Sequence, residues 1–554
     1  MNLIFFTPAC KISAIGRMAA LVTRETVNLG HRVTVVRTES RHFFTTSEHD
    51  FGARIISWED KAEVMAHCRS ADAVIYHIGD NYEFHQGCVY WLSEIPGLVC
   101  LHDFFLGHLF YAWAQANREQ AERILKRWYG EKIAGRFFNF SDSESFIEYT
   151  RDNMPMTEWI CSQADGVITH SRWGCDRVMN SCSGPVKVVP LAYDAPALIS
   201  DPLADKHTDN GNKPLQILTI GHVNPNKRVS SVINAIGSSR ILRNNVVYRL
   251  VGAVQQETIN ALTDLAKGLD VQLIISGEVD DSELQNAIHA SDIISCLRWP
   301  ALEAASASAI ESMLYGKAII VTDTGYYKDI PDTCAVKVNH ANEINEIRTV
   351  LEKFIKDKKS IRDIGTEAQR WATETYTSEK YAAKIIEILQ LMARTIPKKR
   401  AISYFFMTLR NWSQSEIKLP YDESINSLNI FFEENDYGML HKTFQSHTNN
   451  EQYGIQMESL PVNDNIYKQI EKYHENQVSQ EIVLSDQLQR VRNQEALIHV
   501  LSAQLQEVNK RAQRLHMRVQ RLEYKIAKGP LHLKQLLRHP KAFAREVLGL
   551  KFIK

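Results

Sequence analysis

Residues 293–322 of this chain have the sequence IISCLRWPALEAASASAIESMLYGKAIIVT, and the expected architecture follows from it. The apolar run Ile293–Leu297 is typical of a buried strand, and the small residues after it are typical of a helix. Ala318–Thr322 is a second apolar strand. Strand, helix and strand in this order form a parallel unit. The stretch therefore predicts an α/β fold, with a parallel sheet covered by helices.

The same alternation extends on both sides of this stretch, with one interruption. The segment Asp201–Pro214 is polar and rich in turn residues, so it is expected to be a linker. We predict two Rossmann-like domains, residues 1–200 and residues 215–395, that face each other across a cleft. The further strand candidates are Asn2–Phe6, Arg32–Arg37, Ala73–His77, Gly97–Leu101, Gly166–Thr169, Val186–Pro190, Leu215–Ile220, Tyr248–Val251 and Val271–Ser276. A helix is expected over Arg17–Leu29, ended by Gly30.

Composition narrows the class of protein. The chain has 554 residues, 44% of them hydrophobic, and a formal net charge of -1, so nothing points to a nucleic-acid partner. Nine cysteines are scattered without a Cys-x-x-Cys pair, which fits free thiols in a reducing cytosol. No apolar run approaches the ~20 residues of a spanning helix, and no secretory signal opens the chain. A cytoplasmic protein is expected.

The last third of the chain differs from the rest. Residues 401–465 have no regular pattern, whereas residues 471–528 carry apolar heptads that predict an α-helical coiled coil. The coiled coil would join copies of this chain or bind a partner; a single helix packed on the enzyme is the alternative. Residues 529–554 are basic and amphipathic, which predicts binding to an anionic membrane surface or, alternatively, to an acidic protein.

Two groups of residues in the second domain suggest a binding site for an anion. Gly221 follows the strand Leu215–Ile220 and lets a ligand approach the backbone, and Lys227 and Arg228 come shortly after it. These cations suit a pyrophosphate, although two solvated charges in a turn would give the same pattern. Small residues, among them Ala305 and Ser306, open the helix after Ile293–Leu297 and leave its amides accessible.

Two glutamates flank that helix start. Glu303 lies in the preceding loop, where it can accept hydrogen bonds from sugar hydroxyls. Glu311 is eight residues further, about 12 Å along a helix axis, where it can hold the two hydroxyls of a ribose. A capping box over Ser308–Glu311 is the alternative role for the second glutamate.

The combination of Gly-x5-Lys, Glu-x7-Glu and the segment Tyr315–Gly325 resembles the retaining glycosyltransferases of the large "group 1" family, glycosyltransferase family 4, which have the GT-B fold. The resemblance covers residues 1 to about 395. It implies that Lys227 binds the donor diphosphate, that Glu303 contacts the transferred sugar and that Glu311 contacts the ribose. It also implies that Gly16 lies in a loop near the diphosphate and that His102 lies beside the reacting sugar.

The chain departs from the family pattern at two points. His222 stands where the family has an arginine after the glycine, and our hypothesis is that Arg228 takes over its charge. Ala304, Ala305 and Ser306 replace glycines after the first glutamate. Family members commonly work without a metal, so no metal or cofactor is predicted, and the histidines around His77, His85 and His108 lack the spacing of a zinc site.

The sequence thus predicts a retaining glycosyltransferase. It would move a hexose-type sugar from a nucleotide-sugar donor to a glycan, such as a lipid-linked bacterial-type surface polysaccharide, and could sit peripherally on the inner face of the plasma membrane. A nucleotide-sugar epimerase on the same fold is one alternative. A catalytically silent GT-B scaffold that acts through its coiled coil is another.

Overall fold

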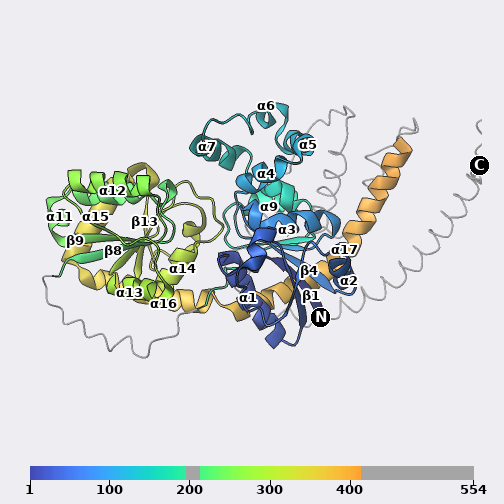
Figure 1. Cartoon of the computed structure of the whole chain (residues 1–554), viewed down its shortest axis with the longest axis horizontal. Coiled ribbons are helices and arrows are strands. Elements are labelled where there is room, and N and C mark those ends of the chain that lie inside the picture. Colours follow the sequence, from blue (N-terminus) through green and yellow to red (C-terminus); the bar gives the residue numbers. More distant parts are fainter. Residues whose placement is uncertain (195–212, 414–554) are drawn as a thin grey trace, which may run out of the picture. The chain divides into compact units, whose positions relative to one another are not determined.

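The computed structural model describes residues 1–194 and 213–413. All the described residues belong to one compact unit, within Met1–Gln452. Most of the expected linker, the coiled coil at 471–528 and the basic tail at 529–554 lie outside the described residues. Both α/β domains can therefore be described within one unit (Figure 1).

The first domain is built on a parallel sheet of seven strands in the order β3-β2-β1-β4-β5-β6-β7. Along β1, Leu3 and Phe5 enter one core while Ile4 and Phe6 enter another, so the apolar run is buried on both faces. The strand order reverses between β1 and β4, and such a reversal opens a crevice at the carboxyl ends of the strands. The strands are β1 Asn2–Thr7, β2 Arg32–Arg37, β3 Arg54–Ser57, β4 Ala73–Ile78, β5 Leu98–Leu101, β6 Gly166–Thr169 and β7 Val186–Val188.

The helices of the first domain include a block that was not predicted. Between β5 and β6 the chain forms α4 Gly107–Ala114, α5 Arg118–Tyr129, α6 Glu131–Ala134, α7 Ser143–Asn153 and α8 Thr157–Cys161. Aromatic rings such as Phe110, Phe137 and Phe146 pack these helices together. The remaining helices are α1 Ala14–Asn28, the 3₁₀ turn η1 Arg41–Thr45, α2 Lys61–Arg69, α3 Tyr82–Glu94 and α9 Cys175–Ser181.

The second domain has a parallel sheet of six strands in the order β10-β9-β8-β11-β12-β13. This order also reverses once, between β8 and β11, so the predicted pair of Rossmann-like domains is confirmed. The strands are β8 Leu215–Ile220, β9 Val246–Val251, β10 Gln272–Ile275, β11 Ile293–Ser295, β12 Ala318–Thr322 and β13 Val336–Val338. The helices are α10 Val229–Gly237, α11 Arg240–Asn245, α12 Gln256–Gly268, α13 Asp281–Ala290, α14 Ala307–Leu314, α15 Glu343–Lys356 and α16 Lys358–Thr375, with the 3₁₀ turns η2 Pro225–Lys227, η3 Gly325–Asp329 and η4 His340–Asn342.

The last described helix, α17 Ser378–Ser413, returns to the first domain and packs against α1 (Figure 1, orange). Its buried residues Tyr381, Ile385 and Leu389 join the same core as Leu3. The prediction of irregular structure from residue 401 is wrong for residues 401–413, which continue this helix. Local pattern did not show it, because α17 is held by contacts with residues far away in the sequence.

Two expectations about side chains and segments can be checked on the described residues. All nine cysteines are described, and none is in a disulfide. None of the helices described in 1–194 and 213–413 is both long enough and apolar enough to cross a membrane.

Candidate active site

The crevice of the second domain opens at the carboxyl ends of β8 and β11, and Gly221 is the first residue after β8. Its φ of +84° lies in the left-handed region, and a Cβ built there would lie 2.8 Å from Lys227 Nζ. The glycine therefore permits both the sharp turn after the strand and the close approach of the lysine. This is a physical reason for the glycine that the sequence alone did not supply.

Lys227 ends the 3₁₀ turn η2 and is only 6% exposed. Its Nζ donates a hydrogen bond to the carbonyl oxygen of Ile220. Burial, with a smaller contribution from the charge of Arg298, lowers the pKa of Lys227 to about 7, while Cys296 and Glu303 act in the opposite direction. An anion bound here would favour the charged lysine, so the site is suited to a negatively charged ligand.

Arg298 is the second cation of this crevice, and sequence reasoning assigned it no role. It follows β11 and is 9% exposed. Its Nη1 donates to the Leu297 carbonyl at 2.9 Å, and its Nε lies 3.8 Å from Glu303 Oε1. The signal that could have found it is its position directly after an apolar strand.

Arg228 has different surroundings from those we expected. It takes a left-handed conformation with φ 55° before α10, and its Nη2 lies 2.5 Å from Glu343 Oε1. Ser231 Oγ donates to the same carboxylate at 2.6 Å. The arginine that electrostatics couples to Lys227 is Arg298, so our hypothesis that Arg228 replaces the missing arginine finds no support in this geometry.

Glu303 lies on a loop that is attached to the first domain through its backbone. Ala304 N donates to the His102 carbonyl at 3.0 Å, and Phe104 N donates to the Leu302 carbonyl at 3.1 Å. Asp103 and Glu303 form an isolated β-bridge. The Glu303 side chain itself is 46% exposed. His102 and Glu303, predicted from separate domains, are therefore brought together.

A small pocket borders Glu303 and includes the predicted positions Ala305 and Ser306. It is lined by Asn226, Arg298, Ala301, Leu302, Glu303, Ala305, Ser306, Tyr326 and Tyr327. Ser306 is the N-cap of α14, because its Oγ accepts a hydrogen bond from Ala309 N at 3.4 Å. The alternative of a capping box over Ser308–Glu311 is thus wrong, since α14 begins earlier than that motif requires.

Glu311 is the fifth residue of α14 and lies among residues of the first domain. Burial raises its pKa, while Arg17 and a hydrogen bond with Tyr193 lower it. Arg17 also forms a salt bridge with Asp194 at 2.8 Å. These partners are far from Glu311 in the sequence, so no local signal indicated them.

Gly16 lies in the first turn of α1, and its amide donates to Ser13 Oγ at 3.0 Å. A Cβ at Gly16 would lie 2.4 Å from the Pro8 carbonyl oxygen, so the position requires glycine for packing. The prediction that the loop with Gly16 lies near the diphosphate stays a prediction, and the amide of Gly16 itself is already bonded to Ser13.

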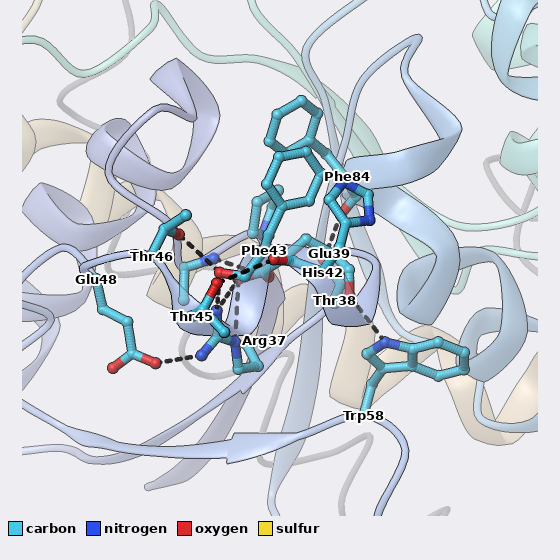
Figure 2. A network of polar contacts seen from close by, with 12 residues as sticks. Arg37, Thr38, Glu39, His42, Phe43, Thr45, Thr46, Glu48, Trp58 and Phe84 are labelled. Atoms are coloured by element: carbon cyan, nitrogen blue, oxygen red, sulfur yellow. Dashed lines mark hydrogen bonds and ion pairs between the residues drawn. The ribbon is translucent and has the colours of Figure 1, made fainter.

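The loop before Gly16 is braced by a network at the end of β2. Figure 2 shows Arg37 between Glu39 and Glu48, with 2.5 Å from Arg37 Nη2 to Glu39 Oε1 and 2.5 Å from Nη1 to Glu48 Oε1. Glu39 Oε2 accepts a hydrogen bond from Ala9 N at 3.0 Å. The fully buried Glu39 is therefore neutralised by Arg37 and anchors the backbone that leads into α1.

His102 belongs to a cluster of buried histidines. Its Nε2 lies 2.9 Å from His77 Nδ1, and its ring centroid lies 4.8 Å from that of His170. Burial lowers the pKa of His102 well below its usual value and that of His77 to about 3. The rings are neutral at pH 7. Among the described residues, no group of three or more side chains is arranged to hold a metal ion.

Asp103, next to His102, is a further ionisable residue, and sequence reasoning assigned it no role. Its Oδ2 accepts a hydrogen bond from Asp80 N at 2.8 Å. Burial raises the pKa of Asp103 to about 8, with Asp80 and Glu303 adding to the effect. Asp80 itself lies 2.5 Å from His108 Nδ1. The carboxyl of Asp103 is therefore mostly protonated at pH 7.

The site of the second domain can now be compared with known proteins. Residues 202–371 match the family Glycosyl transferases group 1. This segment contains Gly221, Lys227, Arg298, Glu303 and Glu311, and the family is the one whose motifs the sequence resembled. The group 1 assignment is thus supported over the second domain.

The individual proteins to which this chain is similar are distant in sequence. The chain is 22% identical over 279 residues to MMP alpha-(1->4)-mannosyltransferase of Mycolicibacterium hassiacum, which is 49% of this chain and 62% of that protein. The chain thus spans less than two thirds of that relative's length. The HepE protein of Anabaena, solved with UDP and glucose, has 14% identity and a TM-score of 0.47, covering 72% of this chain and 100% of that one. Sucrose-phosphate synthase of Thermosynechococcus elongatus has 13% identity and a TM-score of 0.49, covering 71% and 100%.

Proposed function

We propose that this protein is a retaining glycosyltransferase that transfers a hexose-type sugar from a nucleotide-sugar donor to a glycan acceptor. The observation that carries the proposal is the group of Lys227, Arg298 and Glu303 at the strand-order reversal of a domain that matches group 1. Ligands of open parallel sheets bind at such reversals. Cations and a sugar-binding carboxylate at one reversal suit a sugar attached to a diphosphate.

The diphosphate is the leaving group in this reaction, and it gains charge as the sugar bond breaks. Lys227 is buried and gains its full charge when an anion is present, because the anion offsets the cost of burial. The N-terminus of α14 adds amides and a positive helix dipole close to Ser306. Interactions that strengthen as charge develops lower the barrier rather than only tightening substrate binding.

Retention of the anomeric configuration follows from attack on the same face as departure. A double displacement needs an ionised carboxylate as nucleophile. Asp103 is the carboxyl bridged to Glu303, and its pKa of about 8 keeps it mostly protonated at pH 7. A protonated carboxyl is a poor nucleophile, which favours attack by the acceptor hydroxyl with the leaving phosphate as base.

Different residues hold the transferred sugar and the ribose of the donor in this proposal. Glu303 accepts hydrogen bonds from sugar hydroxyls, and Glu311 holds the ribose. His102 contacts the sugar from the first domain; its Nε2 is engaged by His77, which leaves Nδ1 for a hydroxyl. A neutral imidazole suits this role, because it can donate or accept a hydrogen bond.

The proposed acceptor and the proposed roles of the C-terminal segments rest on the sequence. A lipid-linked surface polysaccharide suits a basic tail at 529–554 that binds an anionic membrane, and the heptads of 471–528 suit self-association or a partner coiled coil. Pelleting of the full chain with anionic liposomes, compared with a chain ended at Gly529, tests the tail. Equal pelleting of the two chains rejects membrane binding.

The central experiment is a thermal-shift screen of nucleotide sugars, followed by transfer with the one that stabilises most. We expect that one nucleotide sugar stabilises the protein and that NMR shows an unchanged anomeric configuration in the transferred sugar. We also expect that transfer continues in the presence of EDTA. No stabilisation by any nucleotide sugar identifies a silent scaffold. An altered sugar still attached to its nucleotide identifies an epimerase.

A further inference from the structure

Among the described residues, two buried basic side chains share the crevice of the second domain, and the carboxylate of Glu303 lies near one of them. Lys227 is 6% exposed and Arg298 is 9% exposed. Glu303 Oε1 lies 3.8 Å from Arg298 Nε, but this carboxylate is 46% exposed. Without a ligand, one charged arginine and one lysine whose pKa is lowered to about 7 thus have a half-exposed carboxylate near them. Burial of unpaired charge costs free energy, and proteins retain it where a ligand supplies the missing partner.

The hydrogen bonds of Arg298 leave part of its guanidinium unused. Nη1 donates to the Leu297 carbonyl at 2.9 Å, and Nη2 lies 3.4 Å from Ser308 Oγ. An arginine has five N–H donors, so within the described part of the chain three have no hydrogen-bond acceptor. The side chain lines the small pocket together with Glu303 and Ser306. The free donors are therefore available to a ligand in that pocket.

Arg228, the arginine next to Lys227 in sequence, is committed elsewhere. Its Nε and Nη2 both donate to Glu343 Oε1, at 2.8 Å and 2.5 Å. Glu343 is buried, and it also accepts from Ser231. If Arg228 moved to a phosphate, the buried carboxylate of Glu343 would lose its hydrogen bonds from that arginine. This loss costs free energy and opposes the move.

We propose that Arg298, reached from the end of β11, binds the donor diphosphate together with Lys227 and supplies the second cation of this site. The inference rests on the proposed function, because the diphosphate is that of a nucleotide-sugar donor. A planar guanidinium can contact two phosphate oxygens at once, whereas the lysine acts as a point charge. The same residue then also stabilises the charge of the departing diphosphate.

A purely structural role is the alternative, since Arg298 also ties the ends of its own loop through Leu297 and Ser308. Diphosphate affinity at pH 6, measured together with the melting temperature, separates the two roles. The pKa of Lys227 is shifted by burial and by the nearby groups Arg298, Cys296 and Glu303. Of these three groups, Arg298 is the cation. Its removal raises the pKa of Lys227, so the decline of diphosphate affinity with rising pH moves to higher pH. That shift shows only that the two cations interact. Contact with diphosphate is shown by weaker binding at pH 6, where Lys227 is mostly protonated in every variant, at an unchanged melting temperature.

The test measures binding of UDP, GDP, ADP and TDP to the full chain by calorimetry between pH 6 and pH 9. The variants are Arg298→Met, Arg298→Lys and Arg228→Met. The matched control is Arg243→Met, because Arg243 lies on α11 and bonds the Gly237 carbonyl at 2.6 Å. Melting temperatures of all variants are measured alongside.

For the diphosphate that wild type binds best, Arg298→Met is expected to weaken binding about tenfold to a hundredfold, the range for loss of charged hydrogen bonds. Its pH profile moves upward, Arg298→Lys recovers part of the affinity, and Arg243→Met binds as wild type does. If Arg298→Met does not fold, Arg298→Lys decides: reduced affinity at an unchanged melting temperature supports the inference.

Two results overturn the inference. One is wild-type affinity at pH 6 in folded Arg298→Met or Arg298→Lys. The other is a loss of affinity confined to Arg228→Met. If the wild-type chain binds none of the four diphosphates, the proposed function itself fails, and this outcome differs from both.

Discussion

The backbone amide of Ala304 donates a hydrogen bond to the carbonyl oxygen of His102, with 3.0 Å between nitrogen and oxygen. This bond joins the loop after β11 to the loop after β5. The neighbouring bond from Phe104 N to the Leu302 carbonyl, at 3.1 Å, strengthens the connection. Glu303, between the two bonded residues, is thereby held next to His102, and the predictions below depend on that arrangement.

Glu303→Ala is expected to lower turnover by about a hundredfold or more, as for other groups aimed at a developing charge. Because the side chain is 46% exposed, the free energy of unfolding should change by less than about 1 kcal/mol. Steady-state transfer and chemical denaturation measure the two quantities. Glu257→Ala, on the exposed first turn of α12, is the control. Near-normal transfer by Glu303→Ala would remove Glu303 from the mechanism.

Binding of a nucleoside diphosphate at pH 8 is expected to take up protons. The pKa of Lys227 is about 7 without a ligand, so the lysine is mostly neutral at pH 8, and a bound anion raises the pKa. Calorimetry in two buffers of different ionisation enthalpy measures the uptake. Lys227→Met should abolish it, whereas Lys267→Met, on the exposed surface of α12, should not. Equal uptake in wild type and Lys227→Met contradicts this assignment.

Asp103 makes the protein less stable as pH rises. Its pKa is about 8 when folded and near 4 when unfolded, so between these values the folded state holds a proton that the unfolded state lacks. The stabilisation is complete below about pH 4 and is lost as pH rises through 8. Asp103→Asn mimics the protonated carboxyl and should flatten the free energy of unfolding between pH 5 and 8. Urea titrations at several pH values measure this free energy. If it depends on pH as steeply in Asp103→Asn as in wild type, the assignment to Asp103 is wrong.

Gly221→Ala is expected to impair both folding and ligand binding. The residue has φ +84°, where a side chain costs about 1 kcal/mol or more, and its Cβ would lie 2.8 Å from Lys227 Nζ. Displacement of the lysine should weaken diphosphate binding. Gly268→Ala is the matched control, because a Cβ there meets nothing within 4 Å. If the two variants have the same diphosphate affinity, the role of Gly221 in placing Lys227 is wrong.

Ile385→Ala is expected to destabilise the first domain, although Ile385 follows the second domain in sequence. The side chain is fully buried in the core that includes Leu3, so the cost should be about 2–5 kcal/mol. Denaturant unfolding followed by tryptophan fluorescence measures it. Glu387→Ala, on the exposed face of α17, should cost little. Equal stability of the two variants would mean that α17 does not pack on the first domain.

The sequence by itself determined the elements that depend on local pattern. Apolar runs flanked by turn residues identified strands such as Arg32–Arg37 and Ala318–Thr322 to the residue, and the alternation indicated two parallel sheets. Short strands were missed, because Arg54–Ser57 and Val336–Val338 contain too few apolar residues to stand out. Lys227 and Glu303 could be named because residues after parallel strands gather at one edge of the sheet and because the motifs that contain them resemble those of the group 1 family.

Only the tertiary structure decided which partners these residues have. The order of strands selected the edge between β8 and β11, and strand order depends on pairing between distant segments. Arg228 and Arg298 look alike in sequence, yet one is bonded to Glu343 and the charge of the other lowers the pKa of Lys227. Local preferences are set by neighbours in the chain, whereas the environment of a charge is set by the residues that folding brings around it.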